Sequence, residues 1–173
     1  LDVALSPTLL GATEINADKL RHVLTLIRPF YSQIVVDLGR LDRLGSILLD
    51  RMNDILVVTT TSVQALFEAK RLIGALRRAD FEGDRLRLIV NQHEKTQGYA
   101  GTDLDRVFGI PVFDRFPDAG RELNDAGVRG KMPAENGEYR AHMAKLARRV
   151  AGLPEKISKG PVKQLLSLVD KLR

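Results

Sequence analysis

"DILVVTTTSVQALFEAKRLIGALRRADFEGDRLRLIVNQ", residues 54–92, holds two short apolar runs on either side of one long amphipathic segment. Residues 54–60 and 86–91 are rich in β-branched side chains and apolar on both faces, which is typical of buried strands. Between them, apolar side chains recur at helical spacing within residues 62–79: Val63, Leu66, Ala69, Ile73 and Leu76. A strand, a helix and a second strand in this order predict a parallel βαβ unit.

The alternation of strands and helices continues on both sides of this unit. Further strands are predicted at residues 1–5, 33–38 and 111–116, and further helices at 16–28, 41–52, 103–108, 120–126 and 135–151. Proline at position 29 ends the first of these helices, because proline does not continue a helix. The expected fold class is therefore α/β, a mostly parallel sheet with helices on both faces, arranged as a Rossmann-like three-layer sandwich.

The composition is that of a globular domain and narrows the function only slightly. Of 173 residues, 44% are hydrophobic and 28% are charged, and no apolar run approaches the roughly 18 to 20 residues that span a bilayer. Cysteine is absent, which excludes disulfides and thiolate metal sites in these residues and is typical of a reducing cytosol. The formal charge of +5 permits contact with polyanions, but the basic residues are scattered, which favours a solvated surface.

A carboxylate follows the predicted strand at residues 33–38. In "YSQIVVDLGRLD", residues 31–42, the apolar run from Ile34 to Val36 leads directly into Asp37 and then Gly39. Ligands of parallel sheets bind at the carboxyl ends of the strands, so Asp37 is a candidate for holding a divalent cation. The alternative is a carboxylate that only forms a turn after a buried strand.

The order of these segments resembles the MinD/ParA group of deviant P-loop ATPases. Residues 31–76 resemble the group's acid-ended strand, the helix after it, its next apolar strand and a further helix. The resemblance continues through "LRLIVNQ" and "FGIPVFDRFPDAGRELNDAGVRGKMP" and covers roughly residues 1 to 152. Within the group, "LDVALSPT" at the start and "DLGR" at residues 37–40 are most similar to the CpaE/TadZ pilus-assembly branch. The resemblance implies a P-loop NTPase-like sheet that binds ATP and Mg²⁺.

The resemblance also implies roles for individual residues. Asp37 would be the Walker B and switch II acid, acting on Mg²⁺ through its water shell, and Gly39 would let the backbone approach the γ-phosphate. Asn91 would lie beside the base, and Pro117 and Asp118 would form the loop that passes over it. Each has a simpler alternative, because Asn and Pro-Asp also form ordinary turns at strand ends.

The phosphate-binding loop itself is missing from these residues. Neither G-x-x-x-x-G-K-[ST] nor K-G-G-x-x-x-K-[ST] occurs, and the only Gly-Lys pair, Gly130-Lys131, is followed by Met132. Three interpretations stay open: a P-loop upstream of Leu1, a degenerate loop there, or a chain that never binds nucleotide. Arg40 follows the switch II position and does not activate water, so ATP hydrolysis is also open.

The last residues are predicted to form a separate element. The expected organisation is an ATPase-like portion at residues 1–152, a linker at 153–160 and an amphipathic helix at 161–173. The apolar stripe of this helix has five members: Val162, Leu165, Leu166, Val169 and Leu172. It either docks on the domain or on a second copy, or it contacts a membrane as the C-terminal anchor of MinD proteins does.

The resemblance implies a function in the cytoplasm or at the inner face of the cell membrane. The chain would be an ATP-controlled homodimeric switch that places a pilus or secretion assembly. One alternative is a pseudo-ATPase scaffold that dimerises without turnover. Another is a ParA-type partitioning protein that binds DNA, whose affinity would fall steeply with salt.

Overall fold

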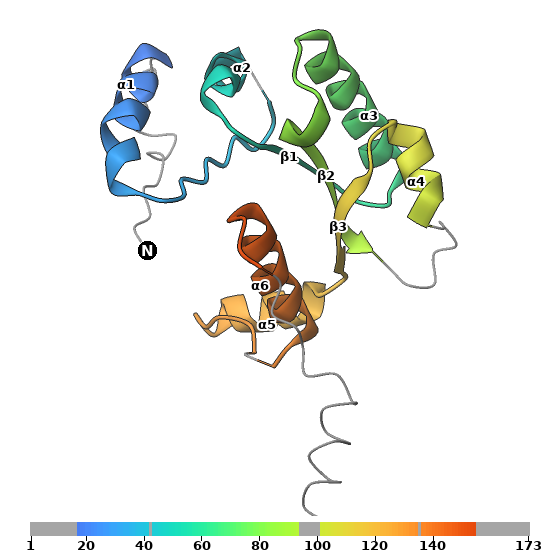
Figure 1. Cartoon of the computed structure of the whole chain (residues 1–173). Coiled ribbons are helices and arrows are strands. Elements are labelled where there is room, and N and C mark those ends of the chain that lie inside the picture. The colour runs from blue at the N-terminus through green and yellow to red at the C-terminus, as the bar shows by residue number, and fades with distance from the viewer. Residues whose placement is uncertain (1–16, 42, 94–100, 135, 155–173) are drawn as a thin grey trace, which may run out of the picture. The chain divides into compact units, whose positions relative to one another are not determined.

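The computed structural model describes residues 17–41, 43–93, 101–134 and 136–154 (Figure 1). The chain divides into two compact units, which are described separately. Unit 1 comprises residues 1–56 and 76–87, and unit 2 comprises residues 57–75 and 88–173.

Unit 1 contains two short helices held together by an arginine. Helix α1 spans Ala17–Ile27 and α2 spans Arg43–Leu48; the 3₁₀ turns are Arg28–Phe30, Leu49–Arg51 and Gly83–Arg85. Arg21 of α1 donates to the Ile47 carbonyl at 2.9 Å and lies 3.4 Å from the Asp50 carboxylate, so it joins α1 to the end of α2. The residues buried in this unit include Leu48, Leu49, Leu76 and Leu86.

The three described strands form one sheet in the order β1-β2-β3. They span Ile55–Thr59, Leu86–His93 and Val112–Pro117, and β2 pairs with β3 in parallel. Helix α3, Val63–Arg78, connects β1 to β2, and α4, Gly101–Phe108, connects β2 to β3 (Figure 1). This arrangement confirms the α/β class with a parallel sheet that the sequence predicts.

The buried side chains of unit 2 come from the strands and from the helices that connect them. They are Val57, Thr59, Ala69, Ile73, Leu88, Ile89, Val90, Leu104, Phe108 and Phe116. The helix between β1 and β2 begins where the sequence predicts, because the Ser62 hydroxyl accepts a hydrogen bond from the Ala65 N–H at 3.3 Å and so caps α3.

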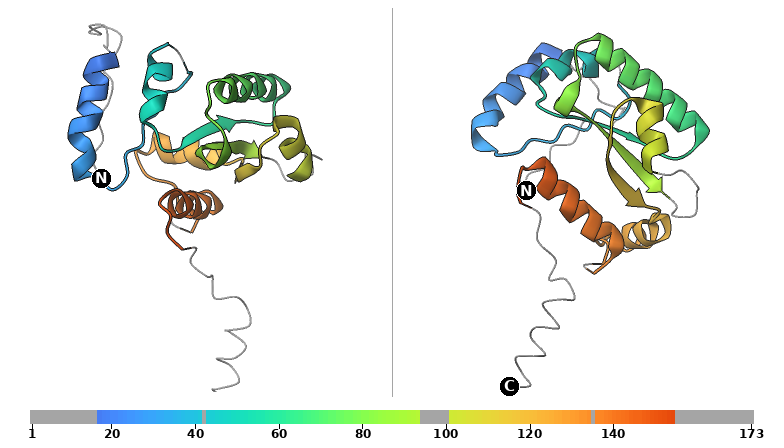
Figure 2. Two further views of the ribbon diagram at one scale, coloured as in Figure 1. Left: turned by 45° about the horizontal axis from the view of Figure 1, so that its top comes forward. Right: turned by 45° about the vertical axis from the view of Figure 1, so that its right-hand side comes forward.

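Two further helices follow β3, and the second packs on it (Figure 2). Helix α5 spans Gly120–Val128 and α6 spans Glu138–Val150. The Phe116 ring of β3 lies 5.7 Å from the Tyr139 ring of α6 in an edge-to-face arrangement. At the other end of α6, the Arg149 guanidinium lies 3.9 Å above the Phe113 ring and donates to the Phe113 carbonyl. These contacts fix both ends of α6 on one strand.

The predicted strand at residues 33–38 is wrong. These residues form neither helix nor strand, and Val35 is 87% exposed, although exposure alternates along the segment with the two-residue period of a strand. A strand exists through hydrogen bonds to a neighbour, and within the described sheet only β1, β2 and β3 are paired. The β-branched run therefore predicts a local preference but not a partner.

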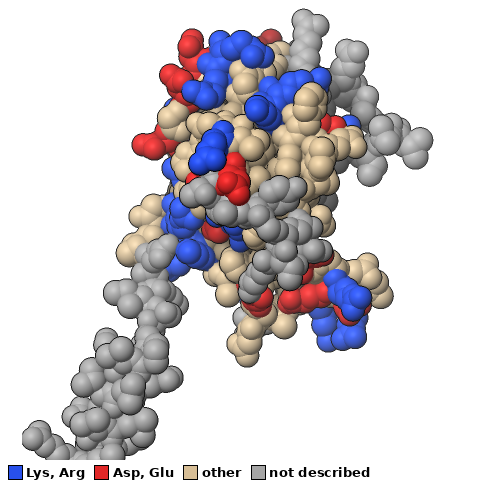
Figure 3. Space-filling view, turned by 90° about the vertical axis from the view of Figure 1, so that its right-hand side faces the viewer, with Lys and Arg blue, Asp and Glu red and all other residues tan. Residues whose placement is uncertain are grey.

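Several predicted segments lie outside the described residues. They are the strand at residues 1–5, most of the linker at 153–160 and the C-terminal helix at 161–173 with its five apolar side chains. Within the ranges that the structure does describe, no helix has the length and apolar character needed to cross a membrane. On the face shown in Figure 3, Lys and Arg side chains are interspersed with Asp and Glu side chains.

Candidate functional site

Pro117 and Asp118 lie where β3 gives way to α5. Pro117 is the last residue of β3, and α5 begins at Gly120. The exposed Asp118 carboxylate accepts a hydrogen bond from the Gly120 N–H through Oδ1 at 3.0 Å. One carboxylate oxygen thus fixes the turn into α5.

Asn91 lies inside β2, two residues before the end of the strand, and not at the exit itself. Its side-chain Oδ1 accepts a hydrogen bond from the Gln92 N–H at 2.9 Å. Gln92 has a φ of 52°, and the register between β2 and β3 shifts at this point, so that His93 pairs with Pro117. The bulged end of β2 therefore places His93, two residues after Asn91, beside Pro117, the last residue of β3, which Asp118 follows.

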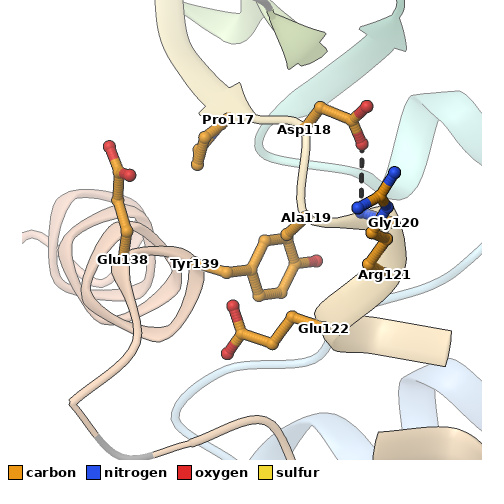
Figure 4. Close-up of a pocket in the computed structure, with 8 residues that line it drawn as sticks. All are labelled: Pro117, Asp118, Ala119, Gly120, Arg121, Glu122, Glu138 and Tyr139. Atoms are coloured by element: carbon orange, nitrogen blue, oxygen red, sulfur yellow. Dashed lines mark hydrogen bonds between the residues drawn. The ribbon is translucent and has the colours of Figure 1, made fainter. Parts of the chain in front are cut away.

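A pocket of about 580 Å³ opens at this end of β3 (Figure 4). It is lined by Pro117, Asp118, Ala119, Gly120, Arg121, Glu122, Glu138 and Tyr139. Its volume lies within the range of about 300 to 1,000 Å³ that is usual for small-molecule sites. Sequence reasoning missed Glu122, Glu138 and Tyr139, because no motif spacing connects the first turns of two separate helices.

The Glu122 carboxylate is held between the two helices. Its Oε1 is buried without a hydrogen-bond partner in the described residues, and a Cβ on Gly137 would lie 2.5 Å from it. Gly137 is the N-cap residue of α6, and no side chain caps that helix. The carboxylate therefore lies close to the N-terminal end of α6, and a side chain at position 137 would require it to move.

The charge of the pocket favours ligands that donate hydrogen bonds. Three carboxylates (Asp118, Glu122 and Glu138) and one guanidinium (Arg121) are among its lining residues. This excess of negative charge repels phosphate groups but suits the N–H groups of a purine base or another amine. The pocket therefore suits a ligand group that donates hydrogen bonds better than it suits an anionic group.

Asp37 and Gly39 form a turn in unit 1. The Gly39 N–H donates to the Asp37 Oδ1 at 2.8 Å, and Gly39 has a φ of 56°, which residues with a side chain rarely adopt. Asp37 is exposed, and because residues 33–38 are not a strand, it does not lie at a strand end. A single carboxylate fits a Mg²⁺ ion that keeps most of its waters. In the described ranges, no three His, Cys, Asp or Glu side chains gather as a metal site.

Taken together, these elements define a class: parallel α/β proteins with a polar pocket at the carboxyl end of a strand. No protein-family model matches the chain, and no curated protein matches it. Solved structures do. The chain is similar to the ParA family ATPase from Chlorobium tepidum TLS, with a TM-score of 0.70 and 20% identity, over 77% of this chain and 57% of that one.

Two structures of MinD from Aquifex aeolicus are also similar to the chain. The MinD cell division protein gives a TM-score of 0.64 at 19% identity, over 84% of this chain and 64% of that one. The MinC:MinD complex gives a TM-score of 0.66 at 19% identity, over 84% of this chain and 63% of that one. The fold is therefore that of the ParA and MinD ATPases, as the sequence resemblance implies. The chain spans less than two thirds of the length of each of these structures.

Proposed function

We propose that the chain is part of a MinD/ParA-type protein of the CpaE/TadZ kind that binds ATP and acts as a nucleotide-controlled dimeric switch in pilus or secretion assembly. The observation that carries this proposal is the pocket beside Pro117 and Asp118, next to the bulged end of β2 that holds Asn91. The similarity of the fold to a ParA family ATPase supports it.

The hydrogen bonds of Asp118, which lines the pocket, and of Asn91, which is not among its lining residues, suggest which base the site would accept. The Oδ1 of Asn91 is occupied by the Gln92 N–H, which leaves the side-chain amide to donate to a ring nitrogen. One oxygen of Asp118 is occupied by the Gly120 N–H, which leaves the other to accept from an exocyclic amine. Adenine offers both a ring acceptor and an amine. Guanine would place its O6 against a carboxylate, so we expect adenine to be preferred.

The Mg²⁺ and phosphate groups would be handled by different residues. Asp37 would hold the water shell of Mg²⁺, which neutralises charge on the phosphates when it is bound, and Gly39 would allow the backbone to come close to the γ-phosphate. Because the 173 residues contain neither P-loop motif, ATP binding is the primary activity proposed. Hydrolysis would follow only where the complete gene product carries such a loop.

The proposed partners follow from the same resemblance. A second copy of the chain would complete the dimer, and pilus or secretion assembly proteins would recognise the nucleotide-bound form. One similar structure is a complex of MinD with MinC, which supports partner binding on this fold. The apolar stripe of residues 161–173 would hold the protein at the inner face of the membrane, with the rest of the chain in the cytoplasm.

A second candidate is a scaffold that binds nucleotide without hydrolysing it. The exposed Arg40 directly after Gly39 favours this reading, since an arginine does not activate a water molecule. A DNA-binding role of the ParA type is less well supported, because acidic side chains interrupt the basic ones on the face in Figure 3. For that role, the affinity for DNA would have to fall steeply as salt rises.

The test is equilibrium binding of ATP and GTP to the complete gene product with Mg²⁺, measured by calorimetry. The decisive variant is Asp118→Asn, which keeps an oxygen for the Gly120 N–H and replaces the free acceptor by an amide donor. The wild type should bind ATP more tightly than GTP. The variant should bind ATP about tenfold more weakly than the wild type, because a hydrogen bond to a charged group contributes about 1.5 to 3 kcal/mol, and it should bind GTP more tightly than the wild type does.

The matched control is Asp125→Asn, an exposed carboxylate of α5, the helix that follows Asp118, and it is not among the pocket-lining residues. Its ATP affinity should equal that of the wild type. A wild type that binds neither nucleotide would refute the proposed function. An unchanged ATP to GTP ratio in Asp118→Asn would remove Asp118 from the base site.

A further inference from the structure

The end of α5 and the turn that follows it, residues 128–132 (the 128–132 turn), present two apolar side chains to solvent. Val128 is 81% exposed and Met132 is 79% exposed. Arg129 and Lys131, which lie between them along the chain, are exposed as well. Nothing in the pocket or the proposed nucleotide chemistry uses these four side chains.

Backbone hydrogen bonds hold the 128–132 turn in place. The Lys131 N–H donates to the Ala126 carbonyl at 2.9 Å, and the Gly130 N–H donates to the Gly127 carbonyl at 3.0 Å. Gly130 has a φ of 60°, so the turn is a Schellman motif that ends α5. Because its backbone is already ordered, a surface that binds it does not have to order it.

The charge around the turn identifies a partner of one kind. No acidic residue occurs between residues 126 and 134, so Arg129 and Lys131 are the charged residues nearest to the apolar tips along the chain, and the exposed Asp125 lies one helical turn before Arg129. An anionic bilayer matches both features: apolar side chains enter the boundary between headgroups and acyl chains, and basic side chains bind the lipid phosphates. The phosphates of DNA would match Arg129 and Lys131 but would offer no apolar layer for Val128 and Met132.

We propose that the 128–132 turn is a contact site for an anionic lipid surface. This contact does not depend on ATP binding, and it is separate from the contact proposed for residues 161–173. It would place the start of the segment between α5 and α6 against the membrane. The pocket beside α5 would then lie near that surface, because α5 connects the pocket to the turn.

The absence of tryptophan from the chain gives a direct test. In the full chain, Met132→Trp places an indole at the tip of the turn, and Val63→Trp places one on α3 at a position that is equally exposed, 78%. With vesicles of phosphatidylcholine and phosphatidylglycerol in equal parts, the emission of Met132→Trp should shift to shorter wavelength. Val63→Trp should show no shift, and vesicles of phosphatidylcholine alone should leave both unchanged.

Removing the positive charges checks the electrostatic part. Adding Arg129→Gln and Lys131→Gln to Met132→Trp should weaken vesicle binding by about 25-fold, because each basic residue near an anionic surface contributes about fivefold in affinity. The proposal is overturned if both indoles respond equally, or if the protein sediments with vesicles while Met132→Trp does not respond. It is also overturned if no vesicle binding occurs, or if Met132→Trp responds to duplex DNA but not to vesicles.

Discussion

Replacing Arg149 by methionine should destabilise unit 2 by about 3 kcal/mol. Arg149 lies 3.5 Å from the Asp114 carboxylate, whose side chain is only 9% exposed, whereas that of Arg149 is 30% exposed. Removing one partner of a buried ion pair costs about 3 to 5 kcal/mol, because the other charge stays buried. The lower end applies here, since Asp114 keeps a 2.8 Å hydrogen bond from the Arg115 N–H.

A double-mutant cycle tests the cause of this loss. Asp114→Asn keeps the bond to Arg115 and should cost about 1 kcal/mol, as an ordinary lost hydrogen bond does. If the unpaired carboxylate is what destabilises Arg149→Met, the double variant should cost about 2 kcal/mol less than the sum of the two. Arg148→Met is the control, because that arginine donates only to the Pro154 carbonyl among the described hydrogen bonds.

The free energies come from urea unfolding followed by far-ultraviolet circular dichroism. An additive cycle, with a coupling below about 0.5 kcal/mol, would refute the argument that Asp114 depends on Arg149. So would an equal loss in Arg148→Met, because it would show that any arginine at this end of α6 has the same effect.

Three further changes in stability are expected in the same assay. Phe116→Ala should cost about 3 to 5 kcal/mol, since the ring is 4% exposed and its removal leaves a cavity under α6; a loss below about 1 kcal/mol would contradict this. Ser62→Ala should cost about 1 kcal/mol by removing the cap of α3, and an unchanged midpoint would show that the bond to Ala65 is not formed. Gly39→Ala should destabilise the fold by about 1 to 2 kcal/mol, because Gly39 has a φ of 56°. Gly127→Ala, inside α5 with open space around it, should be neutral or stabilising. Equal effects at the two glycines would disprove that the positive φ of Gly39 causes the loss.

The elements that sequence reasoning placed well carry their signals locally. The strand predicted at residues 54–60 is Ile55–Thr59, and the helix predicted at 62–79 is Val63–Arg78. The apolar repeat and the cap at Ser62 both lie within the helix or beside it, so no distant contact is needed to interpret them. The strand prediction at residues 33–38 was wrong for the opposite reason, because a strand depends on a neighbouring strand that its own residues do not specify.

The residues that line the pocket also differ in how far the sequence alone could predict them. The sequence analysis selected Pro117 and Asp118 because they follow the strand predicted at residues 111–116 and match a family pattern. Glu138 and Tyr139 join them only because α6 packs on β3, through Phe116 at one end and the Arg149 contacts at the other. Such packing depends on residues more than twenty positions apart in the chain, and the residue spacing within β3 or within α6 does not predict it.

Three predicted site residues turn out to have a common local role. Asp37, Asn91 and Asp118 each accept, through one side-chain oxygen, a hydrogen bond from a backbone N–H one or two residues later. For each of them the sequence left a choice between a turn residue and a ligand residue, but the two roles are compatible. The turn bond fixes the side chain and leaves its second polar atom for a ligand.

This geometry decides which substitutions are informative. Alanine at any of the three positions removes the turn bond together with the ligand contact, so a loss of binding would not separate structure from recognition. Exchanging Asp and Asn keeps the oxygen that forms the turn and changes only the outward atom from acceptor to donor or the reverse. Asp37→Asn, Asn91→Asp and Asp118→Asn should therefore leave the unfolding free energy nearly unchanged. If nucleotide affinity is also unchanged in all three, these side chains serve only their turns.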